Sequence, residues 1–428
     1  MLLDIIRCLL IYYILLFKNS LTYFDITPIL TINLCIIFTK NGDYMLINFK
    51  FSNYKSFKDE AEFSMEPLTN NGSISNAIET GYKKAPNVYR TSAIFGANAS
   101  GKSSFIHAIS YFQGLMEMSY LKRFNEQMEV PAYKLSDTEK NSTFEFEFVK
   151  NKVAYKYFVE LNNEGIVKED AYYTELEEDR REKCLFKRTL TEFSSPYGLD
   201  KEIAKQTIKT RLLISELVNN RNIQDKYILD IYNWTMDIDI LSSDYKEILK
   251  DKILSSKSNL SKKAEFLRKA DIPITKLIVN RDGLFSTHKS ENGQEITFDF
   301  MLEESDGTQM LLCLSEDIFW VLEKGSILFV DELDNSLHPH LVKYLVELFN
   351  NPETNPKGAQ LIFTSHAHYL MDGEHLTRDQ IWFVSKENGY SSDLYSLSDF
   401  KQIKRKKGAF YNEYMYGIFG AIPNINGD

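Results

Sequence analysis

Aromatic and charged residues alternate over residues 143–176. Every second side chain is phenylalanine in Thr143-Phe144-Glu145-Phe146-Glu147-Phe148, and Tyr155 and Tyr157 continue the pattern. A period of two is typical of strands with one buried face. Residues 45–66 show the same alternation, so we expect both ranges to form an antiparallel β lobe.

Three short apolar runs show no such alternation, namely Thr91–Phe95, Ser326–Val330 and Gln360–Phe363. Runs of this length without alternation are typical of parallel strands that are buried on both faces. From about residue 201 to 272 the pattern becomes helical and charged, and we expect a helical insertion there. The chain is therefore predicted to have an α/β fold.

The first apolar run leads into Gly96-Ala97-Asn98-Ala99-Ser100-Gly101-Lys102-Ser103, and a helical pattern then runs to about Met118. A glycine-rich loop between a strand and a helix predicts a phosphate-binding P-loop. Its backbone N–H groups and Lys102 would bind the phosphates, and the Ser103 hydroxyl would bind Mg²⁺. The predicted ATP-binding residues of the loop are Gly96, Asn98, Ser100, Gly101, Lys102, Ser103 and Ser104.

The second apolar run ends in Asp331-Glu332. At the carboxyl end of a parallel strand beside a P-loop, Asp331 is expected to hold Mg²⁺ through water. Glu332 is expected to polarise the water that attacks the γ-phosphate. Leu333-Asp334-Asn335-Ser336-Leu337-His338-Pro339 follows directly, and the third apolar run ends in Thr364-Ser365-His366. The pattern predicts an ATPase with Asp331, Glu332 and His366 at its catalytic centre.

These motifs resemble the heads of ABC-type ATPases, a group that includes SMC, RecF and OLD proteins. The resemblance implies a RecA-like parallel sheet with an antiparallel β lobe, a D-loop after Glu332 and a switch histidine at His366. It also implies a degenerate signature at Glu304-Ser305-Asp306-Gly307-Thr308-Gln309. Ser305 and Gly307 would face the γ-phosphate held by a second protomer, so hydrolysis would require a homodimer or a higher homo-oligomer. The glutamine of the family's Q-loop cannot be placed from the sequence.

From Met45 onward the chain resembles more closely the prokaryotic AAA-family ATP-binding proteins of anti-phage and abortive-infection loci, including PARIS-like systems. Besides the motifs above, the resemblance rests on Phe49–Phe57, including Asn53-Tyr54-Lys55-Ser56, and on Tyr416–Pro423. It implies a slow ATPase that senses infection and restrains or releases a separately encoded effector, a nuclease or toxin. The alternative is a RecF-like or SMC-like DNA-repair ATPase that clamps DNA.

Composition agrees with a large intracellular protein. Four cysteines without paired spacing give no disulfide framework or cysteine zinc site. A net charge of −10 disfavours nucleic-acid binding over the whole surface, although the basic run at residues 401–407 leaves local binding open. We expect a cytoplasmic protein, with nucleic acid as a possible partner and no membrane partner.

Residues 1–44 are strongly apolar and differ from the rest of the chain. Natural translation from Met45, a membrane anchor and a buried helical extension all remain open, although the first apolar run is shorter than a membrane span and contains Asp4 and Arg7. The predicted organisation is this extension, an N-terminal half of the ATPase head at 45–200, the helical insertion at 201–272 and a C-terminal half at 273–428.

Overall fold

The computed structural model describes residues 44–68, 76–124, 126–138, 140–177, 181–242, 259–387, 390–400 and 409–423. These residues belong to one compact unit. The apolar segment at 1–43 and the basic run at 401–407 lie outside the described residues. In the described segments, no helix has both the length and the apolar character that crossing a membrane requires.

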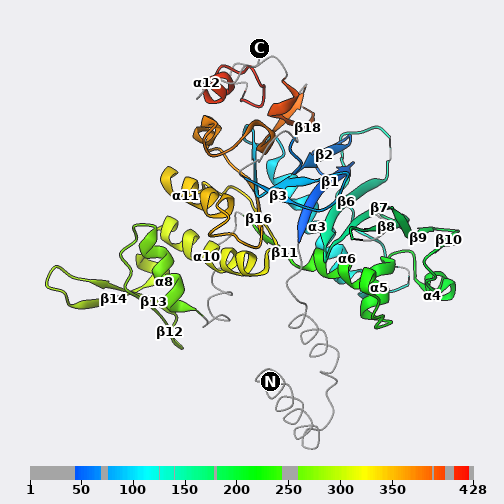
Figure 1. The fold of residues 1–428 in the computed structure, drawn as a ribbon, viewed down its shortest axis with the longest axis horizontal. Coiled ribbons are helices and arrows are strands. Elements are labelled where there is room, and N and C mark those ends of the chain that lie inside the picture. Colours follow the sequence, from blue (N-terminus) through cyan, green and yellow to red (C-terminus); the bar gives the residue numbers. More distant parts are fainter. Residues whose placement is uncertain are drawn as a thin grey trace, which may run out of the picture. The chain divides into compact units, whose positions relative to one another are not determined.

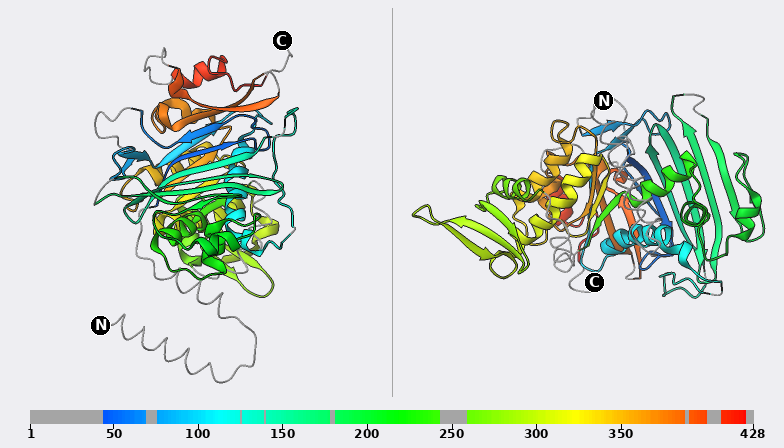
Figure 2. Two further views of the ribbon diagram at one scale, coloured as in Figure 1. Left: turned by 90° about the vertical axis from the view of Figure 1, so that its right-hand side faces the viewer. Right: turned by 90° about the horizontal axis from the view of Figure 1, so that it is seen from below.

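A seven-stranded antiparallel sheet contains the alternating segments and has the strand order β10-β9-β8-β7-β6-β1-β2. Its strands run side by side in both views of Figure 2. They are β1 (Met45–Ser52), β2 (Ala61–Ser64), β6 (Ser142–Lys150), β7 (Val153–Asn162), β8 (Gly165–Glu175), β9 (Lys183–Thr189) and β10 (Phe193–Ser194). Phe144, Phe146 and Phe148 are buried while the glutamates between them are half-buried, which is the one-sided burial that the alternation predicted.

A six-stranded sheet contains the continuous apolar runs and has the order β11-β15-β16-β5-β17-β18. All neighbours are parallel except β17 and β18, which form an antiparallel hairpin. The strands are β5 (Thr91–Phe95), β11 (Ile238–Leu241), β15 (Ile327–Val330), β16 (Gln360–Thr364), β17 (Ile381–Glu387) and β18 (Ser391–Ser396). Because β5, β15 and β16 are parallel neighbours, their carboxyl ends meet at one edge, where the predicted site lies.

Helices α3 (Lys102–Met118) and α6 (Lys226–Met236) pack on the aromatic face of the antiparallel sheet. Phe112 of α3 lies 4.7 Å from Phe146 between ring centroids, and Trp234 of α6 stacks on Phe148 at 3.9 Å. The other α-helices of the described residues are α4 (Lys201–Gln206), α5 (Leu213–Asn219), α8 (Leu260–Lys269), α9 (Phe300–Glu303), α10 (Asp306–Lys324), α11 (Pro339–Asn350) and α12 (Ala409–Met415), and all but α9 are labelled in Figure 1. The fold is thus an ABC-type P-loop ATPase head.

Three features of the structure were not predicted from the sequence. The range 201–272 is not wholly helical, because β11 lies within it and pairs with β15 in the six-stranded sheet. After this range, a small antiparallel sheet forms from β12 (Lys276–Val279), β13 (Leu284–Lys289) and β14 (Glu295–Asp299). A two-stranded sheet of β3 (Ala77–Glu79) and β4 (Asn87–Tyr89) precedes the P-loop strand.

Candidate functional site

The P-loop connects β5 to α3. Gly96 and Gly101 have φ angles of 157° and 118°, and Ala99 is left-handed at 59°. The Lys102 ammonium donates to the carbonyl oxygens of Gly96 at 2.9 Å and Ala97 at 3.1 Å. The loop therefore curls around its own lysine.

Two segments from opposite ends of the chain hold this loop. A Cβ atom on Gly96 would lie 2.3 Å from the carbonyl oxygen of Val384 in β17. A Cβ atom on Gly101 would lie 2.3 Å from Ser392 Oγ and 2.7 Å from Ser56 Oγ. The Ser392 hydroxyl also donates to the Ser100 carbonyl at 2.5 Å, and its N–H donates to the Ser56 carbonyl at 2.7 Å. Glycine is favoured at both positions, because side chains rarely adopt these φ angles and a Cβ atom at Gly96 would also collide with the backbone of β17.

The turn that contains Ser56 joins β1 to β2. Lys55 in this turn is left-handed, with a φ angle of 47°, and its N–H donates to the Pro131 carbonyl at 2.7 Å. Burial lowers the pKa of the Lys55 ammonium below its ordinary value. The contact between Ser56 and Gly101 brings this second lysine close to the P-loop.

Thr364 at the end of β16 connects the two acidic residues that follow β15. Its hydroxyl donates to Asp331 Oδ1 at 2.6 Å and accepts the N–H of Glu332 at 2.7 Å. Asp331 is 6% exposed, and Glu332 has a left-handed φ of 55°. A non-glycine residue in this region costs about 1–2 kcal/mol, so the hydrogen bond to Thr364 helps to hold a strained backbone at the predicted catalytic glutamate.

These acids share an electrostatic environment with Lys102. Burial lowers the pKa of the Lys102 ammonium, and the charges of Glu332, Asp331 and Asp334 oppose that effect. Lys102 is 6% exposed. The structure therefore brings the basic residue of the P-loop and the acids after β15 together at one edge of the sheet.

His366 follows β16 and belongs to the same group. The backbone N–H of His366 donates to both carboxylate oxygens of Asp334, at 3.1 and 3.2 Å. Burial, and then the charge of Lys102, lower the pKa of His366, while Asp334 and Glu332 act in the opposite direction. The lowered pKa favours the neutral imidazole, in which one ring nitrogen donates a hydrogen bond and the other accepts one.

The predicted signature residues contact the D-loop of their own chain. Ser305 is exposed at the N-cap of α10, where its side chain accepts the Thr308 N–H at 3.2 Å. A Cβ atom on Gly307 would lie 2.4 Å from the carbonyl oxygen of Ser336, which is left-handed with φ 61°. Gly307 is thus required by the close approach of the D-loop backbone, and this approach fixes the exposed Ser305 relative to the residues after Glu332.

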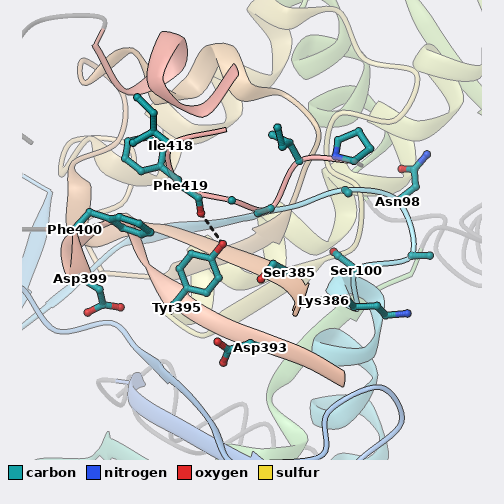
Figure 3. A pocket seen from close by; sticks show the side chains of 16 residues that line it. Asn98, Ser100, Ser385, Lys386, Asp393, Tyr395, Asp399, Phe400, Ile418 and Phe419 are labelled. Carbon is teal, nitrogen blue, oxygen red and sulfur yellow. Dashed lines mark hydrogen bonds between the residues drawn. The ribbon is translucent and has the colours of Figure 1, made fainter. Parts of the chain in front are cut away.

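A cavity of about 860 Å³ adjoins the outer side of the P-loop. Figure 3 shows its walls, to which the P-loop contributes Asn98 and Ser100 and the hairpin contributes Lys386 and Tyr395. The Tyr395 hydroxyl donates to the Phe419 carbonyl at 2.7 Å and holds residues 418–423 along one side. The volume of the cavity is within the ordinary range for small-molecule sites.

The loop fits a nucleoside triphosphate with magnesium. Ser100 Oγ is buried and has no hydrogen-bond partner within the described segments, so a ligand oxygen would satisfy it. The Ser103 side chain is exposed at the start of α3, while Asp331 lies at the end of β15. A hydroxyl and a carboxylate are the oxygen ligands that Mg²⁺ uses in such sites.

Several side chains that shape the site carry no motif of their own. Thr364 could have been inferred from its position at the end of a parallel strand, next to the end of β15. Ser392 and Val384 gave no sequence signal, because their role depends on the close approach of β17 and β18 to the P-loop. Gln113 of α3 donates to the Thr235 and Ile238 carbonyls at 3.0 and 2.7 Å and so ties α3 to α6 and β11.

The fold and the strand-end site together define a P-loop protein with an ABC-type head. Residues 92–372 match the family described as "AAA domain, putative AbiEii toxin, Type IV TA system". This match covers more than half of the chain, and the protein belongs to that family.

No curated protein matches the chain. Among solved structures it is similar to an SmcHead bound to the C-winged helix domain of ScpA, at 16% identity over 82% of this chain and 97% of that chain, with a TM-score of 0.38. It is also similar to a Smc head domain with an extended coiled coil bound to the C-terminal domain of ScpA, derived from Pyrococcus furiosus. That similarity has 14% identity over 88% of this chain and 100% of that chain, with a TM-score of 0.37.

Proposed function

We propose that this protein is an ATP-binding and ATP-hydrolysing switch that closes as a homodimer around ATP. The proposal rests on the grouping of Lys102, Asp331, Glu332 and His366 where β5, β15 and β16 end. The P-loop N–H groups and Lys102 bind the triphosphate, and the nucleoside part occupies the adjoining cavity beside Tyr395.

Ser103 and Asp331 would hold Mg²⁺, which when bound supplies positive charge against the β- and γ-phosphate oxygens. Thr364 keeps Asp331 in place through its hydroxyl. Glu332 orients and polarises the attacking water, while the neutral His366 senses the γ-phosphate through a ring nitrogen. A base positioned in this way contributes about 10²- to 10⁴-fold to a rate.

The exposed side chain of Ser305 supports the proposed composite site. It lies at the N-cap of α10, in a position to face another molecule, while Gly307 and Ser336 join the signature to the D-loop. A second protomer would place its signature over the ATP held by the first. Changes at the nucleotide would then reach the dimer interface through Ser336 and the acids before it.

The biological setting that we propose is anti-phage defence. The family description names a putative toxin of a type IV toxin–antitoxin system, which supports such a setting. In this proposal the ATP-driven change between open and closed dimers restrains or releases a separately encoded effector, a nuclease or toxin, in the cytoplasm.

Light scattering of the Glu332→Gln protein with and without Mg-ATP tests the proposal. We expect ATP to convert a smaller species into a dimer or a multiple of it, because the variant binds ATP but hydrolyses it at least 100-fold more slowly, in line with the loss of a positioned base. Lys102→Ala should neither bind ATP nor change mass. Ser305→Arg should bind ATP without closing.

An ATP-independent mass for Glu332→Gln, or cooperative hydrolysis retained in Ser305→Arg, would contradict the composite site. Turnover that rises steeply with added duplex DNA and falls with salt would favour a DNA clamp over a defence switch.

A further inference from the structure

A second cavity, of about 570 Å³, lies beside α4 and the last strands of the antiparallel sheet. Residues of β8, β9 and β10 form one wall, and α4 with the loop after it forms the other. Figure 1 shows β9, β10 and α4 together. The strand order places β10 at one edge of the sheet and β2 at the other, so this cavity is remote from the β1–β2 turn that contacts the P-loop.

The lining of this cavity is strongly basic, although the whole chain carries a net charge of −10. Only two acidic residues line it, Asp170 and Glu192. The basic residues that line it are Lys168, Lys187, Arg188, Lys201, Lys205 and Lys209. A concave site with one sign of charge concentrates ligands of the opposite sign.

Arg188 is a structural part of the wall. Its guanidinium is 9% exposed and pairs with Glu169 at 3.2 Å, and it also donates to the Arg211 carbonyl at 2.8 Å. Two further bonds from Arg188 reach the Thr207 and Ile208 carbonyls, both at 3.2 Å. The charge of Arg188 is thus already balanced by a carboxylate, and its bonds fix the loop that carries Lys209.

Two of the five lysines are also paired. Lys168 lies 3.3 Å from Asp170, and Lys205 lies 2.7 Å from Glu202 within α4. In contrast, Lys187, Lys201 and Lys209 form no ion pair in the part of the chain that the structure describes, although the charge of Asp170 also acts on Lys187. Lys187 lies instead over the ring of Tyr172, 5.5 Å from its centroid.

We propose that this cavity is a binding site for a compact oligophosphate ligand, separate from the P-loop. Lys187, Lys201 and Lys209 would supply the positive charge, and the hydroxyl groups of Thr191 and Ser194 in the lining would donate hydrogen bonds. The volume is that of a small-molecule site. Nonspecific nucleic-acid sites combine basic grooves that track the backbone with stacking aromatics, whereas these lysines gather around one cavity.

Calorimetric titration of the nucleotide-free Lys102→Ala protein with tripolyphosphate tests this site without the P-loop. We expect binding that weakens at least tenfold when Lys201→Glu and Lys209→Glu are added. Arg281→Glu with Lys289→Glu is the matched control. These substitutions reverse the same number of charges, and both residues are exposed and lie outside the cavity. This control should leave the affinity unchanged.

If Lys102→Ala does not fold, the same titration of the wild-type protein tests the proposal. Two tripolyphosphate sites should then fall to one in Lys201→Glu/Lys209→Glu, while Mg-ATP binding at the P-loop persists. Equal affinity in the cavity and control variants would overturn the proposal, as would no binding outside the P-loop. A charge reversal that weakens binding of short duplex DNA and leaves tripolyphosphate unaffected would also overturn it and assign the patch to nucleic acid.

Discussion

The Thr364 hydroxyl donates to Asp331 Oδ1 at 2.6 Å and accepts the Glu332 N–H at 2.7 Å, so one side chain serves both acids after β15. Thr364 is fully buried. Water cannot replace its hydroxyl without a rearrangement of the strand ends, because the surrounding groups are packed.

Replacing Thr364 with valine should therefore weaken both stability and catalysis. The variant keeps the shape of the side chain but leaves a buried N–H and a carboxylate oxygen without their partner, which costs about 1–3 kcal/mol of unfolding free energy. Urea unfolding measures this loss, and a steady-state assay should show slower ATP hydrolysis. Thr364→Ser keeps the hydroxyl and is the control. A valine variant as stable and as active as wild type would show that the two bonds have no role.

Gly307→Ala tests the close contact between the signature and the D-loop. The new Cβ atom would lie 2.4 Å from the Ser336 carbonyl oxygen, so one backbone must move, at about 1–3 kcal/mol. Gly114→Ala in α3 is a matched control, since its Cβ atom would meet nothing within 4 Å. Removing that helical glycine should stabilise the protein by about 0.5–1 kcal/mol. Thermal unfolding of both variants should give opposite signs, and a neutral Gly307→Ala would contradict the contact.

The pKa of His366 should respond in opposite directions to two nearby substitutions. Lys102→Met removes a positive charge that lowers this pKa, so the pKa should rise. Asp334→Asn removes a negative charge that raises it, so the pKa should fall further. NMR titration of the His366 ring without nucleotide or magnesium measures both. Shifts of the same sign in the two variants would show that the charges do not act through space as the geometry requires.

Because Lys150 at the end of β6 is buried, we expect the stability of the protein to change at alkaline pH. Its ammonium is 1% exposed, lies 3.6 Å from Asp237 Oδ2, and sits 4.5 Å from the centroid of the Tyr44 ring. Burial lowers its pKa from 10.5 to about 8. Between these pH values the unfolded chain binds more protons than the folded one, so the stability of the folded protein rises with pH.

Lys150→Met removes this titration and keeps most of the volume. The unfolding free energy of wild type relative to the variant should increase by up to about 3 kcal/mol between the two pH values. Urea unfolding at several pH values measures the difference. A pH-independent difference would mean that Lys150 has an ordinary pKa in the folded protein.

The main parts of the fold could be predicted because their signals are local. Alternation at Phe144, Phe146 and Phe148 identified the antiparallel sheet, and uninterrupted apolar runs identified β5, β15 and β16. The strand β11 was missed because four residues, Ile238-Asp239-Ile240-Leu241, carry too little pattern within a charged helical region. Its strand character depends on pairing with β15, which no local window contains.

For the candidate site too, the sequence could predict local motifs but not contacts between distant segments. The P-loop and Asp331-Glu332 follow from short motifs whose chemistry constrains neighbouring residues. The second cavity had no such motif, because Lys187, Lys201 and Lys209 become neighbours only when β9 and α4 pack together. Three separate lysines in a chain with many charged residues do not indicate a site in the sequence, because only the folded structure places them around one cavity.

The contacts of Gly96 with Val384 and of Gly101 with Ser392 also have a consequence for how the P-loop folds during synthesis of the chain. A ribosome makes the P-loop sequence early, whereas β17 and β18 emerge about 290 residues later. The growing chain therefore carries the phosphate-binding sequence for most of its synthesis without the neighbours that shape it. Since domains fold as units during translation, we expect the P-loop to take its final shape only when the hairpin has joined the sheet.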